Sequence, residues 1–304
     1  MDALAAIVTL LKPQAVGTKV IRAAGRWGVR YPAFEHPSFA LVLKGSCWLA
    51  VDRRPATILE AGDFVLFPAM PAFTLASDAT VKPRLMTLAP SAAQVEEVFH
   101  GDARTEPSLT MLGGYFAFDP INAAILLDFL PGMLRLRAVD TAGTGVATLV
   151  DLIQREARAN RAARGLVLAR LLEIMLVEAL RCTPADDPAS GLLAGLRDPQ
   201  LAVALRAIHT KTAQRWTLAT LAREAAMSRS SFAERFARVI GITPLNYLLQ
   251  WRLAVAKDLL ARQRKSVAET ALAVGYDSAT GFSTAFSREV GRPPREFIGL
   301  HRSA

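Results

Sequence analysis

The sequence is poor in the side chains that bind metals and form disulfides. Its 304 residues include four histidines and two cysteines, Cys47 and Cys182, and none of them stands at the spacing of a local metal site. We therefore expect no metal, no other cofactor and no disulfide. Both cysteines are interpreted as buried free thiols in a reducing compartment.

Long apolar stretches are also missing. No run of about 18 uncharged apolar residues occurs, and residues 1–11 have neither a basic start nor a cleavage pattern of small residues. We expect no membrane span and no signal peptide, and hence a cytoplasmic protein. Aromatic residues make up only 7% of the chain, but 52% of its residues are hydrophobic, which is typical of a globular protein.

The excess of positive charge is confined to the last third of the chain. Residues 192–304 contain 17 lysines and arginines against 8 aspartates and glutamates, whereas residues 1–191 contain 19 of each class. The formal net charge of +9 therefore belongs to the C-terminal part. A basic region joined to a neutral one indicates a module that binds a polyanion such as double-stranded DNA, attached to a second domain.

The N-terminal part has the pattern of short strands followed by helices. Turn signals at residues 44–46 and 60–63 separate apolar runs within residues 16–90, which predicts a small β-barrel or sandwich. Residues 165–181 are apolar on nearly all sides of a helix, which predicts burial in a core or a homodimer contact. The polar, proline-containing residues 183–191 are interpreted as a linker between domains at 1–182 and 192–304.

The C-terminal region contains an internal repeat. Five small or apolar residues between 218 and 226 recur at a shift of 49, and five residues between 228 and 244 recur at a shift of 50. Each copy predicts a helix, a tight turn with a serine N-cap, and a second helix with two phenylalanines facing inward. A helix over residues 244–262, about 28 Å long, joins the copies, and successive major grooves on one face of DNA lie about 34 Å apart.

The faces opposite those phenylalanines are predicted to contact DNA. The second helix of a helix-turn-helix unit enters the major groove, and its first turns meet the base edges. Small and short polar groups suit base contacts, and the arginines further along the helices suit phosphates. The predicted DNA-contacting residues are Arg229, Ser230, Ala233, Glu234, Arg235, Arg238, Ser278, Ala279, Thr280, Ser283, Thr284 and Arg288.

These motifs resemble the AraC/XylS family of bacterial transcription regulators. The resemblance rests on residues 218–236, 241–244, 251–254 and 274–278, followed by Phe282, Phe286, Gly291 and Pro294. It implies an operator DNA as partner, and RNA polymerase as a further partner if the protein is an activator. It also implies base-reading positions at Ser230, Ala233, Glu234, Ala279, Thr280, Gly281 and Thr284.

The N-terminal half is similar to the cupin-type sensor domain of one branch of that family, through residues 45–49, 59–63, Pro68 and 114–118. Metal-binding cupins carry two or three histidines and a glutamate, but here His36 stands alone near the first motif and Phe73 replaces the histidine of the second. The resemblance thus implies a metal-free apolar pocket for a small organic effector. The predicted effector-binding residues are Phe34, His36, Phe39, Leu41, Trp48, Phe73 and Met86.

The expected fold class is α+β with several domains: an N-terminal cupin-like β-barrel with a helical subdomain, then an all-α domain with two helix-turn-helix units. Three functions compete: a regulator with a sensor barrel, a cupin-type enzyme with an accessory DNA-binding domain, and a DNA-architectural protein without a ligand. The missing metal ligands, with no other catalytic group in sight, argue against the enzyme. The neutral N-terminal half argues against the architectural protein. We predict a homodimeric regulator, activator or repressor, without catalytic residues.

Overall fold

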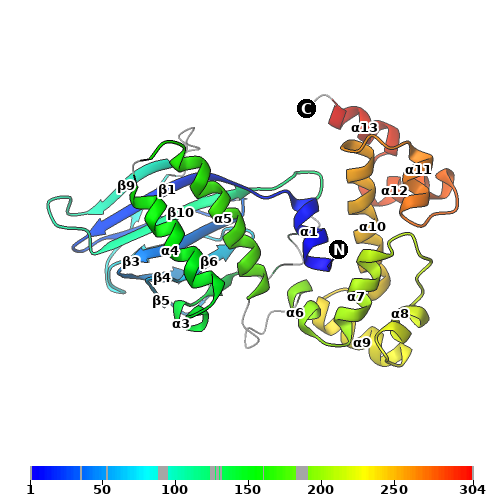
Figure 1. Cartoon of the computed structure of the whole chain (residues 1–304), viewed down its shortest axis with the longest axis horizontal. Coiled ribbons are helices and arrows are strands. Elements are labelled where there is room, and N and C mark those ends of the chain that lie inside the picture. The colour runs from blue at the N-terminus through cyan, green and yellow to red at the C-terminus, as the bar shows by residue number, and fades with distance from the viewer. Residues whose placement is uncertain are drawn as a thin grey trace. The chain divides into compact units, whose positions relative to one another are not determined.

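The computed structural model describes residues 2–34, 36–52, 54–87, 95–123, 127, 130, 132–159, 161–182 and 191–302 (Figure 1). The chain forms two compact units. The barrel unit comprises Pro13–Ala117 and Pro131–Asp187, and the helical unit comprises Met1–Lys12, Phe118–Leu130 and Pro188–Ala304. Of the predicted linker, only Gly191 lies within the described residues. No described helix combines the length and the apolar character needed to cross a membrane.

The barrel unit is built from two sheets. The first has the order β11 (Leu134–Leu136), β6 (Phe64–Phe67), β3 (Ser38–Lys44), β10 (Leu109–Ala117), β1 (Gln14–Ala24) and β9 (Val95–Gly101). The second has the order β5 (Thr57–Glu60), β4 (Ser46–Val51), β7 (Phe73–Ala76), β2 (Gly28–Tyr31) and β8 (Arg84–Leu85). One apolar cluster takes side chains from both sheets, among them Ile21, Val42 and Met111 from the first and Val29, Leu49 and Leu75 from the second. The sheets therefore face each other across a shared core, and the predicted strand-rich N-terminal fold is confirmed.

Both predicted turns are present, and each has a specific cause. Gly45 has a φ of +78°, and a Cβ there would lie 1.9 Å from the carbonyl oxygen of Ser108, so only glycine fits. In the second turn, the backbone N–H of Asp63 donates to Glu60 O at 2.9 Å. Glycine at the first turn and the aspartate at the second thus fix the ends of β3 and β6.

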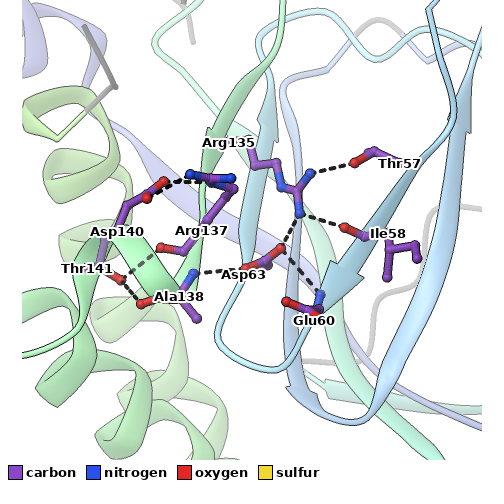
Figure 2. A network of polar contacts seen from close by, with 9 residues as sticks. All are labelled: Thr57, Ile58, Glu60, Asp63, Arg135, Arg137, Ala138, Asp140 and Thr141. Carbon is purple, nitrogen blue, oxygen red and sulfur yellow. Dashed lines mark hydrogen bonds and ion pairs between the residues drawn. The ribbon is translucent and has the colours of Figure 1, made fainter. Parts of the chain in front are cut away.

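The buried carboxylate of Asp63 organises the polar network in Figure 2. It accepts hydrogen bonds from the backbone N–H of Ala138 at 2.9 Å and from the Arg135 guanidinium at 2.6 Å. Arg135 also donates to Thr57 Oγ1 and Ile58 O, both at 2.6 Å. These bonds fasten β11 and the short helix α3 (Ala138–Thr141) to the turn, because a buried carboxylate requires its partners in place.

Two long helices, α4 (Gly145–Arg158) and α5 (Arg164–Arg181), lie across the six-stranded sheet (Figure 1). Six residues of α5, including Leu168, Leu172 and Leu176, are buried. Leu166 and Ile174 remain about half exposed, at 55% and 51%. The prediction of two buried cysteines is half wrong: Cys47 is buried, but Cys182 is exposed because it caps α5 beyond its last buried turn.

The helical unit contains the predicted pattern of short helices. Its described C-terminal helices are α6 (Leu192–Arg197), α7 (Leu201–Thr210), α8 (Leu218–Glu224), α9 (Arg229–Ile240), α10 (Pro244–Ala261), α11 (Val267–Ala273), α12 (Ala279–Val290) and α13 (Pro294–Arg302). Side chains cap five of these helices: Thr217, Ser228, Thr243, Ser266 and Ser278. The Ser266–Glu269 capping box is present.

The two helix-turn-helix copies share one turn geometry. Met227 N–H donates to Ala222 O and Tyr276 N–H donates to Ala271 O, both at 2.9 Å. The residues just before them, Ala226 and Gly275, have φ values of +52° and +83°. Glycine is required in the second copy because a Cβ would lie 2.7 Å from Ala213 O. The repeat inferred from the sequence therefore corresponds to a repeat in three dimensions.

Each copy has its own hydrophobic core. Phe232 and Phe236 belong to one cluster and Phe282 and Phe286 to another, and α10 contributes to both. The ring of His209 stacks on Trp251 at 3.9 Å, and its Nε2 lies 2.6 Å from the hydroxyl of Tyr247. Burial lowers the pKa of His209 to about 3, so this histidine is a neutral core group.

Two N-terminal segments complete the helical unit, although both lie within residues 1–182, the predicted N-terminal domain. Helix α1 (Ala3–Leu11) packs on α7 and α10, and its Ile7, Leu10 and Leu11 are buried in the first cluster. Ile121 is buried in the second cluster. Lys12 Nζ lies 3.1 Å from Asp258 and 3.6 Å from Asp119, and Arg262 lies 3.1 Å from Asp119. The core of the first copy thus includes residues from the start of the chain, and the core of the second copy includes Ile121.

We predict that Ile7→Ala lowers the free energy of unfolding of the helical unit by about 2–4 kcal/mol, because it leaves a cavity in a packed core. The measurement is denaturant unfolding of the full chain followed by the fluorescence of Trp216 and Trp251, which belong to this core. Thr9→Ala, at an exposed position of the same helix, is the control and changes stability by less than about 0.5 kcal/mol. Equal effects of the two substitutions would contradict the role of α1.

Candidate DNA interface and effector cavity

Helix α9 presents a polar face opposite its buried phenylalanines. Arg229, Ser230, Glu234 and Arg238 are exposed, and Ala233 is half-buried between them. The side chains of Arg229, Glu234 and Arg238 form no hydrogen bond or ion pair with the described part of the chain. These groups are therefore free to bind an external partner along one side of the helix.

Helix α12 repeats this arrangement with shorter side chains. Thr280, Thr284 and Arg288 are exposed, whereas Ala279 and Ser283 are half-buried. Ser278 caps the helix by accepting a hydrogen bond from the Gly281 N–H at 3.1 Å. Arg288 pairs with the neighbouring Glu289 at 2.8 Å, and 69% of its side chain is exposed. A pair this exposed contributes little and can open toward a phosphate.

Arg235 is placed differently from the other predicted contacts. Its guanidinium donates to Asp198 Oδ2 and to Gln200 Oε1, both at 2.8 Å. Asp198 also accepts the backbone N–H groups of Gln200 and Leu201 at 3.0 Å. Burial alone would raise the pKa of Asp198, but these backbone bonds and Arg235 together hold that pKa below its usual value. Arg235 thus joins α9 to the start of α7 and is already engaged within the unit.

The spacing of the two faces is set by α10. Its 18 residues give a length of about 27 Å at 1.5 Å per residue, compared with about 34 Å between successive major grooves on one face of DNA. Trp251 donates to Thr212 Oγ1 at 3.1 Å, and Arg252 donates to Thr212 O and Gln214 O at 3.1 and 2.7 Å. These contacts hold the loop between α7 and α8 against α10 and explain why the sequence motif at 251–254 is part of the fold.

The barrel unit contains a cavity of about 120 Å³ between its sheets. Strand β1 contributes Gly17, Lys19 and Ile21. Lys19 and Ile21 lie two residues apart, as residues on one face of a strand must, whereas Gly17 lies at an irregularity in the pairing with β10. The remaining lining residues are Tyr31, Phe34, Ser38, Phe39, Ala40, Met70, Phe73, Leu75, Met86, Thr87, Val98, Met111, Gly113, Gly114 and Tyr115.

Four of the seven predicted effector-binding residues line this cavity: Phe34, Phe39, Phe73 and Met86. The other three lie elsewhere. His36 is exposed and stacks on the lining residue Tyr115 at 5.3 Å without itself lining the cavity. Trp48 lines an open polar hollow beside Asp63 and Arg135. Leu41 is buried, but it is not among the described lining residues, and Ala40 and Val42 are the residues of β3 that pack in the shared core.

Lys19, Tyr31, Met70 and Met111 also line the cavity but were not predicted from the sequence. No strand pattern could predict that Met70 lines the cavity, because Met70 lies outside any strand and pairs with Phe34 through an isolated β-bridge. Among the described residues, no three histidine, cysteine, aspartate or glutamate side chains come together in a way that could hold a metal ion.

Both parts of the chain resemble known protein families. The chain matches the model of the cupin family over residues 2–185 and that of a helix-turn-helix domain over residues 221–299. It is 35% identical over 302 residues to a putative AraC-like transcription regulator of Streptomyces lividans, covering 98% of each chain. It is 28% identical to the transcriptional regulator AlkR of Acinetobacter baylyi, covering 98% of this chain and 99% of AlkR.

Among solved structures, the DNA-binding domain of AdpA in complex with a target DNA is 31% identical. That match covers 35% of this chain and 95% of the AdpA chain, with a TM-score of 0.33. The full-length match to AraC-like regulators agrees with the repeat, the caps and the exposed second helices described above. The chain therefore belongs to the AraC-type DNA-binding transcription regulators and combines an N-terminal cupin domain with a C-terminal helix-turn-helix domain.

Proposed function

We propose that this regulator is a cytoplasmic homodimer that reads its operator with α9 and α12 and is controlled by a small organic molecule in the barrel cavity. The observation that carries the proposal is the pair of matching polar faces, one on each second helix, joined by α10. In this proposal Ser230 and Glu234 contact bases in one half of the site, and Thr280 and Thr284 contact bases in the other. Arg229, Arg238 and Arg288 contact phosphates.

A regulator without catalysis is supported by the chemistry of the cavity wall. Lys19 is the only charged residue among those that the structure places on the wall, and its Nζ pairs with Glu96 at 3.0 Å. Metal catalysis uses histidines, cysteines or carboxylates, and the described wall contains none of them. Lysine and tyrosine can also serve as general acids or bases, but Lys19 is paired with Glu96, and burial raises the pKa of Tyr31 to about 12. The wall instead has the mainly apolar character of a small-molecule binding site.

The polypeptide chain itself connects the cavity to the helical unit, which suits the proposed control of DNA binding. Strand β1 follows α1 after two residues, and β10 ends two residues before Asp119. Both strands line the cavity, through Lys19 and Ile21 on β1 and Met111 and Tyr115 on β10. We propose that displacement of these strands by an effector reaches the cores of both helix-turn-helix copies through α1 and residues 118–122. An effector can shift the equilibrium between the DNA-binding and non-binding states only by as much as its affinity differs between those two states.

The homodimer contact is proposed on α5. Val167 and Ile174 lie seven residues apart on its outer side, with Leu166 beside them, at 39%, 51% and 55% exposure. The half-buried Leu171 completes one apolar stripe. Two such stripes packed together would bury area that water now covers, and a dimer would bring two helical units to one operator and raise avidity.

The DNA-binding proposal predicts two separable classes of variant, measured by fluorescence anisotropy on duplexes selected from a randomised library with the wild-type protein. Ser230→Ala or Glu234→Ala changes base preference in one half-site, and Thr280→Ala or Thr284→Ala changes it in the other. Arg238→Ala weakens binding to all sequences and reduces the slope of log K against log salt by about one. A full chain that shows no salt-dependent binding to any duplex would end the proposal.

Arg235→Ala is expected to act mainly on stability. Removing its guanidinium leaves Asp198 without a charged partner, which costs about 1–3 kcal/mol in the unfolding of the helical unit. Arg238→Ala, at an exposed position one turn along the same helix, is the matched control with an unchanged unfolding midpoint. If Arg235→Ala unfolds like the wild type but loses affinity for DNA, Arg235 is a phosphate contact after all.

The α5 interface is tested by sedimentation velocity at micromolar concentration. The double variant Leu166→Glu and Ile174→Glu should sediment as a monomer, because it places two carboxylates in the apolar stripe. Thr148→Glu, at an exposed position of α4, should leave the dimer intact. A wild-type protein that is monomeric throughout would remove the dimer from the proposal.

The control route is tested with a double-mutant cycle. Ala40→Leu fills part of the cavity and stands in for an effector, and its effect on DNA affinity is compared with and without Asp119→Ala. Since Asp119 connects Lys12 and Arg262, its removal should reduce the effect of Ala40→Leu at least several-fold. Strictly additive effects of the two substitutions would contradict the route.

A further inference from the structure

The cavity in the barrel unit is large enough for one small ring. Its volume of about 120 Å³ is close to that of apolar cavities of about 150 Å³ that bind benzene. A ligand that fits inside has about six or seven non-hydrogen atoms.

The wall favours an uncharged ligand. A buried charge needs a partner of opposite sign, and an unpaired carboxylate or ammonium group is expelled from an apolar site. The ammonium group of Lys19 already pairs with Glu96, at 3.0 Å, on the neighbouring strand β9. The described lining residues offer no other charge to a ligand.

Tyr31 is one of the lining residues that carry a polar side-chain group. Its hydroxyl lies 3.5 Å from Nε2 of the buried His100, at the outer limit of a hydrogen bond, so this contact holds the hydroxyl only weakly. Burial raises the pKa of Tyr31 to about 12. Burial, with the nearby Arg84, lowers the pKa of His100. Both groups are neutral at pH 7, and the hydroxyl can donate to or accept from a neutral oxygen.

The remaining wall suits a ring. Phe73 stacks on Tyr31 with centroids 5.1 Å apart, and Phe34 meets Tyr115 edge-on at 5.5 Å. These aromatic faces form flat surfaces on which a ring can lie. The flexible thioethers of Met70, Met86 and Met111 can close around its edges.

We propose that the cavity binds an uncharged six-membered carbon ring with a single oxygen substituent, such as phenol or cyclohexanol, with that oxygen hydrogen-bonded to the Tyr31 hydroxyl. This inference rests on the proposed function, in which the barrel cavity is the effector site, and it adds the chemical class of the effector. The ring lies against Phe73, and the thioethers enclose its far side.

The test titrates phenol, cyclohexanol, benzoate and 1-hexanol separately into the purified full chain. Binding is followed by calorimetry and by the emission of Trp27, whose ring stacks on His100 at 6.1 Å. Phenol and cyclohexanol should each saturate one site, and the tighter of the two identifies the ring as aromatic or saturated. Benzoate should bind at least about tenfold more weakly because its carboxylate finds no free partner. Hexanol should also bind more weakly because its chain loses more conformational freedom.

Two variants and a control localise the binding. Tyr31→Phe should weaken phenol about tenfold and leave toluene unchanged, because it removes only the hydrogen bond. Thr87→Trp fills the exposed edge of the wall and should abolish binding of every ring compound without disturbing the core. Val139→Ala, at the open hollow beside Arg135, should leave binding unchanged.

The proposal is overturned if neither ring compound binds at millimolar concentration, if benzoate or hexanol binds as tightly as the rings, or if Tyr31→Phe leaves phenol affinity unaltered. These outcomes leave salt-dependent DNA binding untouched, and they concern only the class of the effector. Failure of the proposed function would instead appear as DNA affinity that no occupant of the cavity changes, even when a ring compound is bound.

Discussion

Burial of the apolar face of α1 is the interaction on which the helical unit depends. Ile7 and Leu11 are among the most deeply buried side chains of the chain, and they lie in the same cluster as Phe232, Phe236 and Trp251. Because α9 rests on that cluster, the position of its outward face depends on residues at the start of the chain. The Lys12, Asp119 and Asp258 ion pairs then hold the end of α1 beside α10.

The helix-turn-helix copies could be predicted from the sequence because their determinants are local. Serine caps, a capping box, phenylalanines four residues apart and a glycine with positive φ each act within one or two turns of chain. Helix α1 carries no comparable signal. Its nine residues are uncharged and only mildly periodic, and its partners lie about 200 residues away in the sequence. A contact of that kind depends on tertiary packing, which a local pattern does not record.

The site residues likewise divide into those set by local periodicity and those that depend on distant contacts. The outward faces of α9 and α12 could be predicted because helical periodicity separates them from the buried phenylalanines. The engagement of Arg235 with Asp198 could not, because the two residues are 37 positions apart. On β3 the inward face could not be assigned, since Phe39, Leu41 and Val42 are all buried and both faces of the strand look apolar. Strand alternation predicts a face only when one side is exposed.

The segments of the two units alternate along the chain. The helical unit is assembled from residues 1–12, 118–130 and 188–304, and the barrel unit occupies the two intervals between them. The polypeptide therefore passes from one unit to the other four times. A single nick at any of these passages, including the one that follows residue 187, leaves part of a hydrophobic core on each fragment. A cut after residue 187 keeps both segments of the barrel unit on one fragment, but no single cut releases the helical unit intact. A gene fusion that exchanges only residues 188–304 would also exchange the partners of Ile7, Leu11 and Ile121.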